Sequence, residues 1–151
     1  MDECTNFRNN MRYLRLKRGL TATALGDAIA HTSGWVTCTE TGAYTRWPKT
    51  IDMIAIAKVL GTTVEEMLKP LPDGIVLYIS PEEHETGLEN LEKIRRHRKM
   101  LKAVFAKKIG VTNKHYSQVI NGYSNFSIKA WWRIAKNLKM NLNVLLGRDA
   151  E

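Results

Sequence analysis

The chain has 151 residues and a net charge of +8, with 44% hydrophobic and 25% charged residues. This is an ordinary globular composition, and no run approaches the ~20 apolar residues of a membrane span, so a membrane partner is not expected. The first residues lack the basic and apolar regions of a signal peptide. Cys4 and Cys38 show no CxxC spacing, which favours free thiols and a cytoplasmic location.

The charge is distributed unevenly along the chain. Residues 1–72 hold nine Lys/Arg and seven Asp/Glu, whereas residues 73–86 hold four acids and no Lys/Arg. Residues 87–151 hold fourteen basic and four acidic residues, a net charge of +10. So basic a segment is expected to attract a polyanion, either nucleic acid or an acidic membrane face. A merely solubilising surface is the alternative.

The same pattern occurs twice, about eighty positions apart. The first set is Arg15, Arg18, Leu25, Ile29, Val36 and Gly42, and the second is Arg95, Arg98, Phe105, Ile109, Tyr116 and Gly122. A repeat of this length predicts two domains of roughly 65 residues, each near the lower limit for a self-supporting core. We call residues 1–72 copy one and residues 87–151 copy two, joined by a linker of residues 73–86.

Helical periodicity predicts five helices in copy one. Gly19 ends the first, and Thr21 caps the second. The third is expected over residues 33–41, and a Thr63-x-x-Glu66 capping box begins the fifth. The residues expected to line the apolar faces are Phe7, Met11, Leu14 and Leu20 of the first helix and Ile51, Ile54, Ala57 and Leu60 of the fourth.

The linker carries the strongest strand signal in the sequence. Residues 75–79 are β-branched, aromatic or aliphatic and lie between Gly74 and Pro81. Because a lone strand is unstable, this one is expected to pack between the domains or pair with the same strand of a second chain. The acids that follow, at positions 82, 83 and 85, indicate a solvated connector.

Copy two follows the same five-helix path. Gly110 lies where a tight turn favours a residue free to adopt positive φ, and Asn141 can cap the last helix. Copy one has Ala30 at the position of Gly110, so its turn should be differently shaped or strained. Trp131 and Trp132 diverge by ~100° on the fourth helix. One should be in the core, and the other on the linker strand, a partner subunit or the core's periphery.

The order of these motifs resembles the phage repressor, Cro and Xre regulator family. In copy one the matching segments are residues 25–29, 35–42 and 56–61, and in copy two they are residues 105–112 and 117–122. The resemblance implies an all-α protein of two five-helix, lambda-repressor-like helix-turn-helix domains. It also implies binding of double-stranded DNA, with the third helix of a domain in the major groove.

The resemblance places the main DNA contacts of copy two on its third helix. Asn and Gln side chains can pair bidentately with adenine, and Lys can donate to guanine. Phosphate contacts are expected just after this helix, at the start of the second helix and on the basic end of the first. The candidate residues are Asn113, Lys114, His115, Ser117 and Gln118, then Asn121, Tyr123 and Ser124, then Lys102 and Arg95.

Copy one is poorer in base-selective side chains. Ser33, Trp35 and Thr37 occupy the corresponding positions, and none offers a bidentate contact. Its loop over residues 43–49 is two residues longer and places Arg46 between aromatics. The loop is either a finger that contacts the DNA backbone or minor groove, or a segment whose aromatics pack on Trp35.

The resemblance also implies an ion pair in copy one, between Arg15 of the first helix and Glu40 at the end of the third. Copy two has Ile120 in place of the glutamate. Arg95 is therefore expected to be unpaired within its domain and free to face phosphate or solvent.

Together these features predict a sequence-specific transcriptional regulator of phage or prophage repressor type, acting mainly through copy two. Symmetric DNA sites could be occupied by both copies of one chain, or by copy two of each subunit of a homodimer, which the charge asymmetry favours. The alternative is an antitoxin-like protein-interaction module that uses copy one or the linker strand. No metal-ligand spacing, catalytic grouping or phosphate-binding loop is present, so no cofactor, metal or enzymatic activity is expected.

Overall fold

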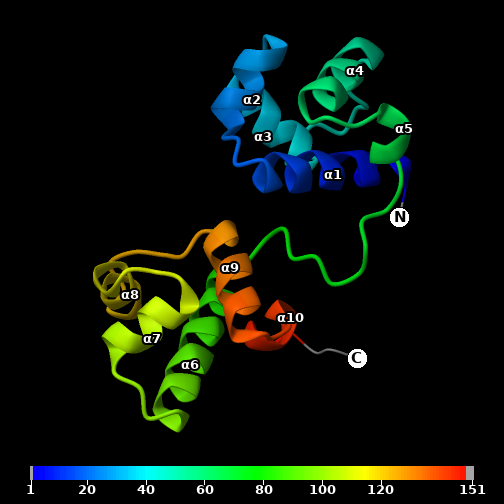
Figure 1. The fold of residues 1–151 in the computed structure, drawn as a ribbon. Coiled ribbons are helices and arrows are strands. Elements are labelled where there is room, and N and C mark those ends of the chain that lie inside the picture. The colour runs from blue at the N-terminus through cyan, green and yellow to red at the C-terminus, as the bar shows by residue number, and fades with distance from the viewer. Residues whose placement is uncertain (1, 149–151) are drawn as a thin grey trace. The chain divides into compact units, whose positions relative to one another are not determined.

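The computed structural model describes residues 2–148, and the chain divides into two compact units, Met1–Leu77 and Tyr78–Glu151. We call them the first unit and the second unit. Within the described residues each unit contains five helices, α1–α5 in the first and α6–α10 in the second (Figure 1). Each unit therefore has its own helical core.

The first unit is built from five helices around one apolar core. They are α1 (Glu3–Lys17), α2 (Ala22–Ile29), α3 (Ser33–Thr41), α4 (Thr50–Val59) and α5 (Val64–Met67). Helix α2 packs on α3 and α4, while α1 packs on α3 and α5. Phe7, Leu25, Val36, Ile56 and Met67 are fully buried where these helices meet.

Side-chain caps fix where the helices of the first unit begin. The Oγ1 atoms of Thr21, Thr32 and Thr63 accept hydrogen bonds from the third amide of α2, α3 and α5. The turn after α2 has the left-handed geometry that glycine favours, with Ala30 at φ 59° and ψ 43°. Of the two expectations for this turn, the structure therefore favours strain over a different shape.

The second unit also consists of five helices, with two short helices after a long first one. Its helices are α6 (Pro81–His97), α7 (Lys102–Ile109), α8 (Asn113–Ile120), α9 (Ile128–Leu138) and α10 (Leu142–Leu145). Helix α7 packs on α8 and α9, and α10 packs on α6 and α9. Trp131 is fully buried, and an added Cβ on Gly87 of α6 would lie 2.6 Å from its ring. Gly87 thus leaves room for the indole at the centre of this core. Trp132 is half-buried.

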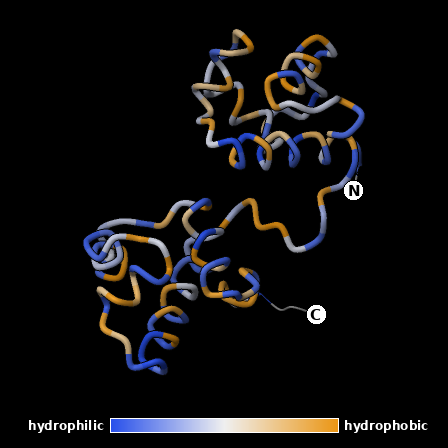
Figure 2. The backbone as a smooth tube through the Cα atoms, in the orientation of Figure 1, coloured by the Kyte–Doolittle hydropathy of each residue, from blue (hydrophilic) through white to orange (hydrophobic). Residues whose placement is uncertain are grey.

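The predicted linker strand is wrong. Residues 75–79 adopt no strand, and none is present anywhere in residues 2–148. The segment is an apolar run between α5 and α6 (Figure 2), and Arg12 Nε donates to the Leu77 carbonyl at 2.9 Å. A β-branched run supplies strand propensity, but without a second strand in the described chain no ladder can form. Pairing of this segment with the same segment of a second chain stays a prediction.

The acids expected to form a solvated connector belong to helix α6 instead. Ser80 and Glu83 form a reciprocal capping box, and Pro81 occupies the first turn. Glu83 also pairs with Arg148, whose Nη2 donates to the Tyr78 carbonyl at 2.7 Å. With its three additional glutamates, the second unit has fourteen Lys/Arg and seven Asp/Glu, a net charge of +7. Residues 81–86 thus lower the charge of this unit from the +10 of residues 87–151.

The buried face of helix α4 is only in part the face that the sequence predicted. Ile51 and Ile54 were expected in the apolar stripe but are 74% and 55% exposed. Met53 and Ile56 are buried instead, while Ala57 and Leu60 are buried as expected. Because Ile51 and Ile54 lie one turn apart, they form an exposed apolar face on the first unit.

Candidate nucleic-acid interface

Helices α7 and α8 and the turn between them form the candidate interface of the second unit. The turn is made by Gly110, at φ 89°, whose amide closes α7 through a hydrogen bond to the Ala106 carbonyl. Thr112 then begins α8, because its side chain accepts from the His115 amide at 3.1 Å. Local sequence therefore determines where α7 ends and where α8 begins.

The outer face of α8 presents amide and lysine side chains to solvent. Tyr116 and Val119 are buried and anchor the helix, while Asn113, Lys114 and Gln118 are exposed. At ~100° per residue, Lys114 and Gln118 lie on the side of α8 opposite its buried residues, and Asn113 lies at the edge of that side, one turn before Tyr116. The helix can therefore offer hydrogen-bond donors and acceptors to a base edge without unfolding.

Two of the candidate residues on α8 are less accessible than the others. Ser117 and His115 are half-buried. The His115 ring packs edge-on against Phe126, with centroids 5.3 Å apart, and Phe126 is buried. His115 therefore helps hold α8 on the loop before α9, and its contribution to a DNA surface is limited to its exposed part.

The start of α7 is open to an anion. Leu101 occupies the N-cap position without a side-chain hydrogen bond, whereas Thr21 caps α2 in the first unit. Lys102 follows and is exposed. Uncapped amides at a helix N-terminus favour phosphate, and the adjacent ammonium group adds to the attraction. The missing cap is a feature that the resemblance alone did not reveal.

The segment after α8 adds further polar groups. Asn121 is exposed, Gly122 adopts φ 84°, Tyr123 is 84% exposed and Ser124 is half-buried. A tyrosine so exposed is available to a partner. These residues continue the exposed surface of α8 beyond its C-terminus.

Arg95 is not free, contrary to the expectation from sequence. Its Nε and Nη2 donate to the two carboxylate oxygens of Glu92 at 2.8 and 3.0 Å, and its Nη1 donates to the Met100 carbonyl at 2.9 Å. The Tyr116 hydroxyl donates to Glu92 at 2.6 Å. Arg95 therefore acts as a structural link between α6, the turn that follows it and α8.

These contacts determine the protonation states of Glu92 and Tyr116. The hydrogen bonds from Arg95 hold the pKa of Glu92 below its usual 4.5, and burial together with the bond to Glu92 raises the pKa of Tyr116. Glu92 is thus a carboxylate and Tyr116 a neutral donor at neutral pH. A glutamate three residues before Arg95 on one helix was a signal that sequence could have supplied.

The first unit holds its corresponding arginine by a different carboxylate. Arg15 Nε and Nη2 donate to Glu40 at 2.7 and 3.0 Å, as the family resemblance implies, and Arg12 Nη1 lies 3.7 Å from Glu40. Eighty positions on, Arg12 corresponds to Glu92 and Glu40 to Ile120. The carboxylate that pairs with the arginine therefore lies on the third helix in the first unit and on the first helix in the second unit. Both units keep a bidentate arginine–carboxylate pair.

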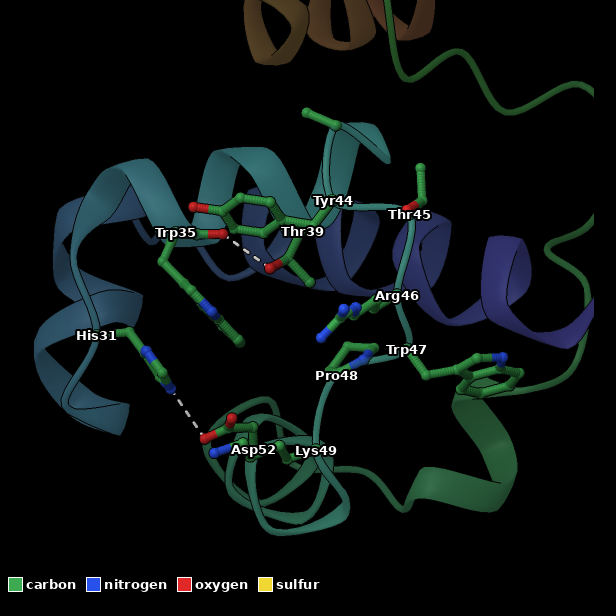
Figure 3. Close-up of a pocket in the computed structure, with 11 residues that line it drawn as sticks. His31, Trp35, Thr39, Tyr44, Thr45, Arg46, Trp47, Pro48, Lys49 and Asp52 are labelled. Atoms are coloured by element: carbon green, nitrogen blue, oxygen red, sulfur yellow. Dashed lines mark hydrogen bonds and ion pairs between the residues drawn. The ribbon is translucent and has the colours of Figure 1, made fainter.

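The candidate residues of the first unit are placed differently from those of α8. Ser33 and Thr37 are exposed on α3, but Trp35 is half-buried and its ring is stacked on His31, with centroids 3.8 Å apart. Among the described residues, the ring stacked on Trp35 is thus that of His31 and not an aromatic of the 43–49 loop. Arg46 is exposed and lines a cavity beside Trp35 (Figure 3).

Three further findings bear on other site classes. Within residues 2–148, no three His, Cys, Asp or Glu side chains are grouped as a metal site would require. Cys4 and Cys38 are both free thiols. None of the helices in the same stretch has both the length and the apolar character needed to cross a membrane.

Residues 91–145 match the model of a protein family described as helix-turn-helix. The match runs from the middle of α6 to the end of α10, so it covers the α7–turn–α8 interface and leaves the first unit outside. No curated protein and no solved structure matches the chain. The similarity to the helix-turn-helix family is thus confined to the second unit and includes helices α7 and α8.

Proposed function

We propose that this chain is a sequence-specific regulator of transcription, of phage or prophage repressor type, that reads double-stranded DNA with helix α8. The observation that carries the proposal is the exposed face of α8, where Lys114 and Gln118 lie opposite buried Tyr116 and Val119 and Asn113 is exposed at its edge. These side-chain types can discriminate adenine and guanine in the major groove by ~1–3 kcal/mol for each good pair.

Phosphate contacts by the second unit supply most of the binding free energy. Lys102 and the uncapped amides of α7 lie on one side of α8 in the chain, and Asn121, Tyr123 and Ser124 on the other. Each neutralised phosphate releases counterions, so the affinity should fall steeply as salt is raised. Arg95 is left out of this set because Glu92 holds it.

The first unit is a second copy of the same scaffold with a different task. Its five helices follow the same order, yet Ser33 and Thr37 are short side chains that cannot select a base bidentately. We assign it to assembly, in a homodimer whose two α8 helices occupy half-sites about one DNA turn, ~34 Å, apart. The exposed Ile51 and Ile54 offer this assembly an apolar face.

A second candidate function is an antitoxin-like interaction module. The same exposed isoleucines favour it, because an apolar face on a small domain can equally be covered by another protein. The two functions differ in whether the protein selects a duplex. Enrichment of no sequence from a random pool of duplexes, at low salt, would decide for the interaction module.

Fluorescence anisotropy on a selected duplex tests the assignment of α8. Asn113→Ala and Lys114→Ala should each weaken binding to the selected duplex by about five- to 150-fold and lower the preference over a scrambled one. Ser33→Ala and Thr37→Ala are matched controls on the corresponding helix of the first unit and should leave the preference unchanged. The opposite pattern would show that α3, not α8, selects sequence.

A further inference from the structure

A cavity in the first unit lies between α3, the 43–49 loop and the start of α4 (Figure 3). Its volume is about 490 Å³, within the ~300–1,000 Å³ range common for small-molecule sites. Its lining combines an aromatic ring, Trp35, with two cations, Arg46 and Lys49. The proposed function of α8 makes no use of this cavity.

The indole of Trp35 is a rigid platform at one side of the cavity. The His31 ring covers one of its faces, at a centroid distance of 3.8 Å and an interplanar angle of 11°. His31 Nε2 is in turn 2.9 Å from Asp52 Oδ1 on α4, and Thr39 Oγ1 donates to the Trp35 carbonyl at 2.8 Å. The ring is thus held in place from behind, and Figure 3 shows it pointing into the cavity.

The two cations of the cavity, Arg46 and Lys49, outnumber its one carboxylate, Asp52. Arg46 points into the cavity toward Trp35 from the opposite side (Figure 3). Within the described part of the chain, the side chains of Arg46 and Lys49 have no salt-bridge partner, and the acid of the lining, Asp52, is engaged by His31. An anionic group that enters the cavity would meet two cations.

We propose that this cavity binds a nucleotide, with its base stacked on Trp35 and its phosphate held by Arg46 and Lys49. A nucleotide joins the two chemical features that the lining selects, a flat π surface and an anion. Unstacked bases stack on aromatic side chains and on arginine guanidinium planes, and every base has such a face. The nucleotide is either a free mononucleotide or one unit of a single strand, and both present the same chemistry.

Calorimetric titration of the full chain with adenosine monophosphate tests the proposal. Saturable binding is expected, and adenosine, which lacks the phosphate, should bind more weakly. Trp35→Leu removes the platform and should weaken binding by about five- to 150-fold, the range expected from loss of one stacking contact. Arg46→Ala should also weaken it, and since Arg46 is exposed this variant keeps the test valid if Trp35→Leu fails to fold.

Lys58→Ala is the matched control, because Lys58 is an exposed cation of α4 that is not among the cavity residues. It should bind adenosine monophosphate as the wild type does. A short deoxyadenosine oligomer that competes at lower concentration than the mononucleotide identifies a single strand as the source, and the reverse order identifies a free nucleotide.

Three results would overturn the proposal: no saturable heat, unchanged affinity in the Trp35→Leu/Arg46→Ala double variant, or benzoate binding as tightly as the nucleotide. Anisotropy on the selected duplex with the same proteins keeps this test separate from the role of α8. The cavity variants should retain duplex selection even if nucleotide binding is lost.

Discussion

The Glu92–Arg95–Tyr116 network is expected to be a main source of stability in the second unit. Glu92→Gln keeps the shape of the side chain but removes the charge that accepts two bonds from Arg95 and one from Tyr116. Truncating one partner of a fully buried pair costs ~3–5 kcal/mol. Because the Glu92 and Arg95 side chains are 14% and 16% exposed, water partly compensates, and we expect a loss of about 2–3 kcal/mol at pH 7.

Native-state hydrogen exchange is the suitable assay, since it reports α7 and α8 separately from the first unit. The pKa of Glu92 is depressed in the folded protein, so the carboxylate stabilises above its usual pKa of 4.5, and this contribution is lost as the pH falls below that value. The difference between wild type and Glu92→Gln should therefore shrink in acid. Glu89→Gln, at an exposed position one turn earlier, should change little.

A charge exchange tests the reasoning further. Glu92→Arg combined with Ile120→Glu would reproduce the arrangement of Arg12 and Glu40 in the first unit. The double variant should be more stable than Glu92→Arg alone, with a coupling free energy of about 1–3 kcal/mol. A loss below about 0.5 kcal/mol for Glu92→Gln, or no coupling in the double variant, would refute the role given to this network.

Three other predictions concern the turns, the pH dependence and the end of the second unit. Gly110→Ala should lower the free energy of unfolding by at least about 1–2 kcal/mol, because φ is 89° and the new Cβ would meet neighbouring side-chain atoms at 2.6–2.8 Å. Ala30→Gly should instead raise it by about 0.5–1 kcal/mol, because glycine adopts the positive φ of this position without strain. Thermal unfolding measures both changes. Burial lowers the pKa of His84 from 6.5, so neutral His84 stabilises the folded protein above pH 6.5 and this stabilisation is lost as the pH falls. His84→Gln should therefore make the free energy of unfolding depend less on pH below 6.5. An unchanged pH dependence would contradict this role of His84. Arg148→Ala should lower the free energy of unfolding by about 0.5–1 kcal/mol at pH 7 and by less near pH 2, because the arginine lowers the pKa of Glu83 to about 2. An equal loss at both pH values in urea titrations would count against the Arg148–Glu83 pair.

Helix boundaries were predictable where a local capping signal coincides with the apolar period. The third helix was expected over residues 33–41, where α3 is found, and Thr21 caps α2 as expected. The Arg15–Glu40 pair, implied by the resemblance, is present. These features depend on a few neighbouring residues or on a pairing shared by the family, so sequence contains them.

Two of the wrong expectations share a physical cause, because they depend on which segments and side chains meet across the fold. Residues 75–79 have strand propensity, but a strand needs a partner that the described chain does not provide. The burial of Ile51 on α4 was judged by period alone, and which face of the helix is covered depends on its packing. The partner of Arg95 lies on its own helix, and the resemblance directed attention to α8 instead.

The roles assigned to the candidate DNA-contacting residues remain predictions. The structure places Asn113, Lys114 and Gln118 on an exposed helical face, and the family match covers that helix. Which bases they contact depends on the duplex.

The most direct test of the central claim is selection from a random pool of DNA duplexes by the full chain, with the mass of the complex measured on the selected duplex. We predict one palindromic motif, two chains per duplex, and loss of the motif in Asn113→Ala/Lys114→Ala/Gln118→Ala but not in Ser33→Ala/Thr37→Ala. A motif that survives the α8 substitutions and disappears with those in α3 would contradict the account, as would the absence of any enriched duplex.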